Sequence, residues 1–322
     1  MRLPFRRAVI TGGAGFLGSH LCGALLRRGV DVVCVDDFCT SAPENVRHLR
    51  PDPGFSLVRN DVSVALDVPG HVDLVMHLAS PASPADYRLL PIATLRAGSH
   101  GTTNALELAA RKQARFVLAS TSEVYGDPHE HPQRESYPGN VDPVGPRSCY
   151  DEAKRFAEAL TTAYRDNRRV DTVIVRIFNS YGPRMRAGDG RVVPTFICQA
   201  LAGSPLTVAG DGSQTRSLCF VDDTIDGLLA AATRGHRGPV NIGSPEEVEV
   251  LALARRVKKL TGSASAIEFV ERPPGDPERR RPDTTLAGEL LGWRPRVSLD
   301  EGIGRTVSWF RRHRGTRPEV IG

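Results

Sequence analysis

Short apolar runs alternate with longer helical patterns over the first half of the chain. The apolar runs lie at residues 8–11, 31–36, 55–59, 73–78, 115–120 and 172–178. Patterns of helical period lie between them, for example at 15–28, 98–112 and 149–167. Strands that are apolar throughout and separated by helices are typical of a parallel sheet covered on both faces. The pattern therefore predicts a doubly wound α/β fold.

After residue 178 the pattern changes, because proline and glycine become frequent and the elements become shorter. We therefore expect two parts, a first domain over 1–178 and a smaller, mixed α/β substrate lobe over 179–322. A helical pattern at 221–232 and an apolar run at 240–242 suggest that a segment near 216–243 returns to the main sheet. The two parts are thus predicted to interleave.

Composition narrows the class of protein only broadly. The 322 residues are 40% hydrophobic and 25% charged, with a net charge of +5, as expected for a soluble globular protein. The sequence has no stripe of basic residues interleaved with aromatic residues, so we do not expect nucleic-acid binding. No apolar stretch approaches the ~18–20 residues of a membrane span. The six cysteines have no metal-like spacing, and no signal peptide is recognisable. We expect a cytoplasmic protein with free thiols and no metal site.

A glycine-rich segment follows the first predicted strand and opens a helix. Gly12, Gly15 and Gly18 permit a tight turn, close approach to a pyrophosphate and close helix packing. Asp36 ends the second predicted strand at the distance typical of a residue that binds the adenosine ribose. Together with Asp37 it would repel a 2′-phosphate. The segment therefore predicts a Rossmann-type site for NAD rather than NADP.

Further cofactor contacts are expected along the same edge of the sheet. Asp61 follows the third strand and is interpreted either as an adenine-edge contact or as a loop cap. The other expected contacts are Phe16, Leu17, Thr40, Val62, Leu78 and Ser80, together with Tyr150 and Lys154.

Tyr150 and Lys154 stand four residues apart in a predicted helix and therefore share one face. A cation beside a phenol stabilises the phenolate, so we expect Lys154 to lower the pKa of Tyr150. Tyr150 then acts as a general base on a sugar hydroxyl that Thr121 also binds, while a hydride moves to the nicotinamide. This constellation predicts redox chemistry on a sugar alcohol.

These motifs resemble the extended short-chain dehydrogenase/reductase superfamily and, within it, the UDP-glucuronate decarboxylases (UDP-xylose synthases). The similarity extends over nearly the whole chain. The segments that carry it are residues 77–84, 119–128, 144–155, 176–185, 189–193, 212–216 and 281–283.

The resemblance implies a reaction in three steps: NAD oxidises C4 of UDP-glucuronate, carbon dioxide is lost, and the hydride returns to give UDP-xylose. It makes Tyr150 the base and later the acid, tuned by Lys154, and has Thr121 position the sugar. It implies that Glu123 works near C5 of the sugar and that Arg280 engages the substrate. The other substrate contacts that it implies are Ser122, Asn179, Arg191 and Arg216.

Three alternatives remain open. Nucleotide-sugar 4,6-dehydratases usually carry an acidic Asp where this chain has Ser122, which disfavours dehydration. The 4-epimerases typically lack a carboxylate at the position of Glu123, which argues against them less strongly. A non-catalytic NAD-binding scaffold is the remaining alternative.

The chain departs from the family pattern at two positions, Gly98 and Ala209, where relatives often carry Asn and an aromatic residue. The resemblance also implies a homodimer formed through helices near 98–112 and 149–166. The small residues Ala105, Ala109, Ala153 and Ala157 of these helices suit either such an interface or an internal core.

Overall fold

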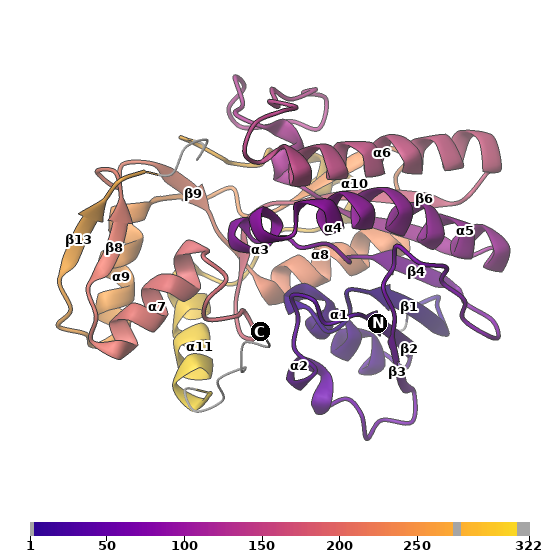
Figure 1. Ribbon diagram of the computed structural model, residues 1–322, viewed down its shortest axis with the longest axis horizontal. Coiled ribbons are helices and arrows are strands. Elements are labelled where there is room, and N and C mark those ends of the chain that lie inside the picture. Colours follow the sequence, from indigo (N-terminus) through magenta and orange to yellow (C-terminus); the bar gives the residue numbers. More distant parts are fainter. Residues whose placement is uncertain (1–2, 273–277, 314–322) are drawn as a thin grey trace.

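A parallel sheet of seven strands forms the centre of the protein (Figure 1). The computed structural model describes residues 3–272 and 278–313. The strand order is β11-β6-β5-β4-β1-β2-β3, and all neighbours are parallel. The strands are β1 (Arg7–Thr11), β2 (Asp31–Asp36), β3 (Phe55–Arg59), β4 (Leu74–His77), β5 (Arg115–Thr121), β6 (Thr172–Ile177) and β11 (Pro239–Ile242). The doubly wound fold is confirmed, and the apolar run at 240–242 does return to the main sheet as β11.

Helices cover both faces of this sheet. On one face lie α1 (Phe16–Leu26) and α8 (Val221–Arg234), and on the other α5 (Thr102–Lys112) and α6 (Ser148–Arg168). Successive side chains of a strand point to opposite faces. Accordingly, Val9 is buried in the cluster that contains Ala105 of α5, whereas Ile10 is buried in the cluster that contains Leu21 of α1.

The segment before α5 is more helical than the sequence pattern indicated. Two short helices, α3 (Pro84–Leu89) and α4 (Pro91–Arg96), each begin with a proline, which suits the first position of a helix. A π-helical turn at Ala97–Gly101 then joins α4 to α5. The predicted helix at 98–112 therefore starts within this π-helical turn.

The C-terminal lobe is a small mixed α/β unit, drawn on the left of Figure 1. Strand β8 (Leu206–Ala209) pairs in parallel with β13 (Ile267–Val270), and α7 (Val192–Ala202), α9 (Val250–Thr261) and α11 (Leu299–Arg312) pack together beside them. The remaining elements of the described chain are a 3₁₀-helical turn at Ser122–Tyr125, α2 (Glu44–Arg47), β7 (Ser180–Tyr181), β9 (Thr215–Ser217), β10 (Cys219–Phe220), β12 (Glu247–Glu249) and α10 (Thr285–Leu291). The division at residue 178 stays a prediction.

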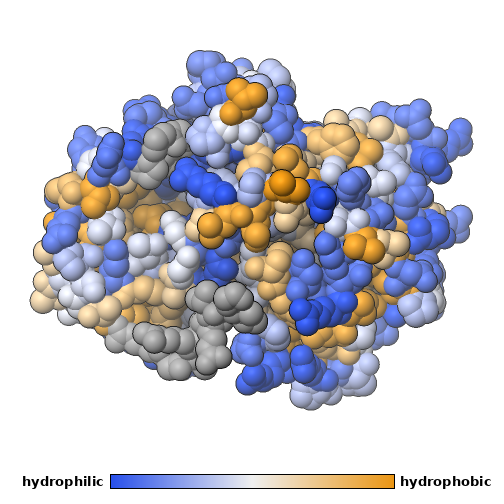
Figure 2. Space-filling model, in the orientation of Figure 1, coloured by the Kyte–Doolittle hydropathy of each residue, from blue (hydrophilic) through white to orange (hydrophobic). Residues whose placement is uncertain are grey.

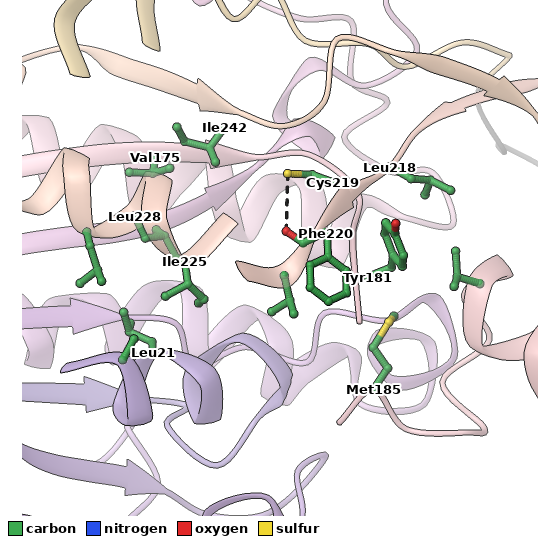
Figure 3. Close-up of a cluster of buried hydrophobic side chains, with 14 of the residues drawn as sticks. Leu21, Val175, Tyr181, Met185, Leu218, Cys219, Phe220, Ile225, Leu228 and Ile242 are labelled. Atoms are coloured by element: carbon green, nitrogen blue, oxygen red, sulfur yellow. Dashed lines mark hydrogen bonds between the residues drawn. The ribbon is translucent and has the colours of Figure 1, made fainter. Parts of the chain in front are cut away.

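One hydrophobic core extends from the main sheet into the lobe (Figure 3). Val175 of β6 and Leu21 of α1 belong to the same buried cluster as Tyr181, Met185 and Phe220. Because these last three lie in the segments that lead into the lobe, the two parts are held together by continuous packing. Over the described ranges, no helix is long and apolar enough to cross a membrane.

Asp223, in the first turn of α8, anchors a C-terminal segment to this core. Its buried carboxylate accepts the amides of Arg296 at 3.0 Å and Val297 at 2.9 Å, and its carbonyl accepts the indole N–H of Trp293 at 3.0 Å. Substitution of Asp223 by alanine removes the carboxylate and keeps the carbonyl, so the amides of Arg296 and Val297 lose their acceptor.

We expect Asp223→Ala to lower the free energy of unfolding by about 1–3 kcal/mol, because buried donors are left unpaired. Urea unfolding followed by tryptophan fluorescence measures this. Asp226→Ala, on the same helix, is the matched control, since its ion pair with Arg28 is exposed and contributes only about 0–1 kcal/mol. Equal losses in the two variants would contradict the prediction.

Candidate active site

A single cleft between the main sheet and the C-terminal lobe is lined by every residue that the sequence predicts to contact cofactor or substrate. The carboxyl ends of β1, β2, β4 and β5 open into it, as expected for ligand sites of open α/β sheets. Its volume of about 3240 Å³ exceeds the ~300–1,000 Å³ of a site for one small ligand. A dinucleotide and a nucleotide sugar can therefore lie in it side by side.

The glycine-rich turn fits a dinucleotide pyrophosphate. Gly12 has a φ of +67°, and a Cβ there would lie 2.8 Å from the backbone of Ala79. Gly15 is the N-cap of α1, and no side chain caps that end of the helix. The first amides of the helix are thus free to bind an anionic group, which the positive end of the helix dipole also favours.

Asp36 is buried at the end of β2 with its carboxylate largely occupied. It accepts the amide of Ala14 and the amide of Phe38, each at 2.9 Å. The Ser41 hydroxyl adds a third hydrogen bond of 2.7 Å. Since a carboxylate offers about four lone-pair sites, one remains for a ribose hydroxyl. The neighbouring Asp37 carboxylate instead accepts the amide of Cys39 at 3.0 Å.

Two other expected cofactor contacts lie at this end of the cleft in different settings. Asp61 accepts the amide of Ser63 at 2.8 Å, so it does cap its loop, as one of the two interpretations proposed. The carbonyl of Thr40 accepts a hydrogen bond of 3.3 Å from Arg186, which also pairs with Asp86 at 2.5 Å. This bridge from the lobe to α3 was not predicted from the sequence.

Tyr150 and Lys154 lie on one face of α6 and are both buried, as their spacing predicts. The Lys154 ammonium donates a 2.9 Å hydrogen bond to the carbonyl of Ala119 and lies 5.9 Å from the centre of the Tyr150 ring. Burial lowers the pKa of Lys154 to about 8. Thr121, at the end of β5, lies near enough to the phenol to act on its pKa.

The pKa of Tyr150 differs from the sequence prediction. Burial raises it, and the negative charge of Glu123 raises it further, against the hydrogen bond with Thr121. Lys154 is directed at the carbonyl of Ala119 and is itself desolvated, so it does not reverse the effect of burial. The expectation that Lys154 lowers the pKa of Tyr150 below its usual value was therefore wrong.

His77 is a buried residue of this site that the sequence did not single out. Its ring contacts the hydroxyl of Thr11 at 2.7 Å and lies near the backbone of Ala97 in the π-helical turn, which acts on its pKa. Burial, followed by the charge of Lys154, lowers the pKa of His77 to about 3. His77 is thus a neutral residue that lies between the end of β1 and the π-helical turn at Ala97–Gly101.

Glu123 is held between two arginines. Arg147 and Arg280 each donate to one of its carboxylate oxygens, and Arg280 also donates to the carbonyl of Gly126 at 2.8 Å. Although burial acts to raise it, the charges of Arg280 and Arg147 lower the pKa of Glu123 to about 2. The carboxylate is therefore ionised at neutral pH. The structure thus brings together Glu123 and Arg280, both expected in the site, and adds Arg147, three residues before Tyr150, which the sequence did not single out.

A second carboxyl lies close to this cluster. Asp151 is buried in the first turn of α6, and one of its oxygens has no hydrogen-bond partner among the described residues. Burial and then the charge of Glu123 raise the pKa of Asp151 to about 7, against the opposite effect of Arg147 and Arg280. Two neighbouring carboxyl groups thus have strongly separated pKa values.

The remaining predicted substrate residues line the same cleft at different depths. Arg191 is paired with Asp189 at 2.5 Å and lies 5.8 Å from the centre of the Phe16 ring, beside the glycine-rich turn. Its charge also acts on Tyr150, so Arg191 lies near both the glycine-rich turn and the phenol. Arg216 donates to the carbonyl of Thr215 at 2.7 Å, and Asn179 is partly buried at the lobe boundary.

The two departures from the family pattern have different structural settings. A Cβ at Gly98 would lie 2.6 Å from the Cβ of Ala153 on α6, so the π-helical turn and α6 meet there without room for a side chain. Ala209 ends β8 in an open part of the cleft, where its carbonyl accepts the side chain of Gln214 at 2.8 Å. Over residues 3–272 and 278–313, no His, Cys, Asp and Glu cluster is arranged to hold a metal ion.

The comparison with known protein families gives one match, over residues 8–243, to the NAD dependent epimerase/dehydratase family. The chain is 50% identical over 305 residues to UDP-glucuronic acid decarboxylase 1 of Arabidopsis thaliana, covering 95% of this chain and 70% of that protein. It is 48% identical over 307 residues to UDP-glucuronic acid decarboxylase 1 of Xenopus tropicalis, covering 95% and 72%.

Solved structures agree on the fold and on the class of cofactor. UDP-glucuronic acid 4-epimerase from Bacillus cereus, in complex with UDP-glucuronic acid and NAD, superimposes with a TM-score of 0.85 at 30% identity, covering 95% of this chain and 99% of that one. The dTDP-glucose 4,6-dehydratase from Streptomyces venezuelae, with NAD bound, gives 0.88 at 28% identity, covering 96% and 98%. The chain therefore belongs to the NAD dependent epimerase/dehydratase family and is, within it, a homologue of the UDP-glucuronic acid decarboxylases.

Proposed function

We propose that this protein converts UDP-glucuronate to UDP-xylose and carbon dioxide, with NAD as a cofactor that is reduced and reoxidised within each turnover. The observation that carries the proposal is the position of Glu123 between Arg147 and Arg280, next to Thr121 and Tyr150. It is supported by relatives that are named UDP-glucuronic acid decarboxylases and align with almost the whole chain.

The charges of this cluster favour a sugar acid. Two guanidinium groups face one ionised carboxylate, Glu123, so one positive charge is in excess whenever Asp151 is protonated. An uncompensated buried charge is costly, and a sugar carboxylate would neutralise it. Ser122, which has no acidity near neutral pH, offers no proton for the dehydration of a neutral hexose.

The first step is oxidation at C4 of the sugar. Bound NAD supplies the acceptor of the C4 hydride and later its donor. Tyr150 removes the proton of the C4 hydroxyl while Thr121 holds the oxygen of that hydroxyl. Because burial raises the pKa of Tyr150, its phenolate needs positive charge nearby. The Lys154 ammonium and the charge of oxidised nicotinamide are expected to provide it together.

The second step breaks the bond between C5 and the carboxylate carbon. With a ketone at C4, the bonding electrons pass into an enolate as carbon dioxide leaves, and the Tyr150 phenol and Thr121 hydroxyl stabilise the enolate oxygen. C5 then gains a proton before the hydride returns to C4 and Tyr150 returns its proton to the oxygen. Since Glu123 has a pKa of about 2, we infer that it orients a water that donates the proton to C5, and bulk solvent then protonates the hydroxide that remains.

We also propose that the protein is a homodimer, in which exposed apolar side chains of α3, α4 and α6 are covered. Ile92 and Leu89 have exposed fractions of 66% and 79%, and Phe156 has 49%. Hydrophobic residues gather over α3 and α4 in Figure 2. Exposed patches of this kind often mark association sites. The alanines Ala105, Ala109, Ala153 and Ala157, which suited either an interface or a core, are buried within the chain.

Incubation of the purified protein with UDP-glucuronate and NAD should release carbon dioxide and yield a product that has lost the mass of one CO2. In D2O the product should carry one deuterium at C5, because that carbon is protonated after decarboxylation. Tyr150→Phe should reduce the rate by about 10²- to 10⁴-fold, since it removes the general base. An isomer of unchanged mass would indicate a 4-epimerase, loss of water a dehydratase, and no turnover a scaffold.

The activity should fall as the pH rises through about 8, where Lys154 loses its proton and no longer stabilises the phenolate. Lys154→Arg should be slower but should lack this decline, because a guanidinium stays charged. Lys259→Arg, on the exposed side of α9, is the control and should keep the wild-type profile. The assignment fails if wild-type kcat stays constant up to the ordinary lysine pKa of about 10.4 while the protein remains folded.

Light scattering at micromolar concentration should give the mass of a dimer. Phe156→Glu should shift this mass toward the monomer without unfolding the chain, because Phe156 is half exposed in the protomer. Val144→Glu introduces the same charge at a residue that is 91% exposed and lies outside the three helices, and it should remain dimeric. A monomeric wild-type protein would contradict the dimer proposal.

A further inference from the structure

Tyr87, on the short helix α3, stacks on the proposed catalytic base. Its ring and that of Tyr150 are 5.3 Å apart between centroids and inclined by only 8°. Tyr87 is almost fully buried, with an exposed fraction of 1%, and it lines the cleft. Parallel, offset rings at this separation attract one another. Nothing in the sequence pattern singled out this residue.

Several contacts fix the position of Tyr87. Ser83 caps α3 by accepting the amide of Asp86 at 3.1 Å, and Asp86 is paired with Arg186 of the lobe at 2.5 Å. The thiol of Cys149, next to Tyr150, donates to the carbonyl of Tyr87 at 3.5 Å. The guanidinium of Arg147 lies 5.9 Å from the centre of the Tyr87 ring. The stack is therefore anchored from α3, from α6 and from the lobe.

The orientation of the Tyr150 ring is not fixed by its own torsion angles. The torsion that turns a tyrosine ring about its own axis has broad minima, so a staggered rotamer alone does not fix the plane of the ring. Thr121 acts on the phenolic oxygen, at the end of the side chain, and leaves the plane of the ring undetermined. In the proposed reaction this oxygen must meet a sugar hydroxyl whose C4–H bond is aligned with the nicotinamide. A parallel ring restricts the rotation that would spoil this alignment.

The hydroxyl of Tyr87 plays no part in the stack. It is enclosed and has no hydrogen-bond partner among the described residues, although Glu123, Arg147 and Asp151 act on it electrostatically. Burial raises the pKa of Tyr87 to about 12, so the group is neutral at working pH. An unpaired buried hydroxyl contributes no stabilising bond, and its removal with retention of the ring is expected to cost little.

We propose that Tyr87 is a positioning residue of this enzyme, whose ring holds the ring of Tyr150 in the plane required for proton and hydride transfer. The inference rests on the proposed function and deepens it. The ring, and not the hydroxyl, performs the task. Tyr87 thereby links the lobe, through Arg186 and Asp86, to the geometry of the base.

The test compares Tyr87→Phe, which keeps the stack, with Tyr87→Leu, which removes it. Tyr87→Phe should keep the wild-type kcat. Tyr87→Leu should lower kcat by about 10- to 100-fold, as expected for a misplaced catalytic group, with KM and bound NAD nearly unchanged. The part of the pH profile that reflects ionisation of Tyr150 should also move to lower pH, because the Tyr150 phenol loses part of the cover that desolvates it, whereas the decline assigned to Lys154 should not move to lower pH.

Tyr137→Leu is the matched control, since it removes a buried tyrosine that stacks on Tyr125 at 6.1 Å instead of on Tyr150. It should change stability without changing the pH profile. If Tyr87→Leu does not fold, Tyr87→Met is used in its place, because the longer methionine side chain fills more of the space left by the tyrosine ring. Each protein and its Tyr150→Phe derivative are then titrated with base and followed by ultraviolet absorbance. The difference between the two curves reports the ionisation of Tyr150 independently of turnover.

Wild-type kcat and titration in Tyr87→Leu would overturn the inference. Equal losses in Tyr87→Phe and Tyr87→Leu would overturn it as well, because they would assign the effect to the hydroxyl. Tyr87→Leu could instead keep the wild-type pH profile and lose activity only in proportion to its loss of stability, as Tyr137→Leu does. That result would also overturn the inference, because it would assign Tyr87 a role in packing alone. Failure of the wild-type protein to release carbon dioxide would instead overturn the proposed function.

Discussion

The carboxylate of Glu123, held between Arg147 and Arg280, is the interaction on which the site depends. It joins the end of β5 to the start of α6 and to the C-terminal part of the chain. Removing one partner of such a buried ion pair leaves an uncompensated charge, at a typical cost of about 3–5 kcal/mol. The cluster therefore fixes the relative position of the three segments that make up the reacting end of the cleft.

Around this cluster, the parallel sheet determines where chemistry is possible. Its strands end at one edge, so the glycine-rich turn after β1, Asp36 of β2 and Thr121 of β5 open into the same cleft. Close backbone contacts then set the spacing of the elements. Gly98 brings the π-helical turn against Ala153, between Tyr150 and Lys154, where a side chain would not fit. Tyr150 and Lys154 are thus backed by packing that leaves no room for a side chain at position 98.

The same burial tunes each ionisable group in a different direction. It lowers the pKa of Lys154 and His77, raises those of Tyr150 and Asp151, and is overcome at Glu123 only by two guanidinium charges. Groups with separated pKa values can hold and release protons at different stages of one reaction.

The sequence by itself determined the succession of strands and helices along the chain, the glycine-rich turn, Asp36, and the placement of Tyr150 and Lys154 on one helix face, because these depend on local periodicity and short spacing. It also placed Glu123 and Arg280 in one site through resemblance. Only the tertiary structure decided that Arg147 completes the cluster, that His77 links two segments, and that Tyr87 stacks on Tyr150. It also reversed the expected pKa of Tyr150. Stacking, ion pairing and desolvation depend on side chains brought together from distant parts of the chain, and no local pattern records those distances.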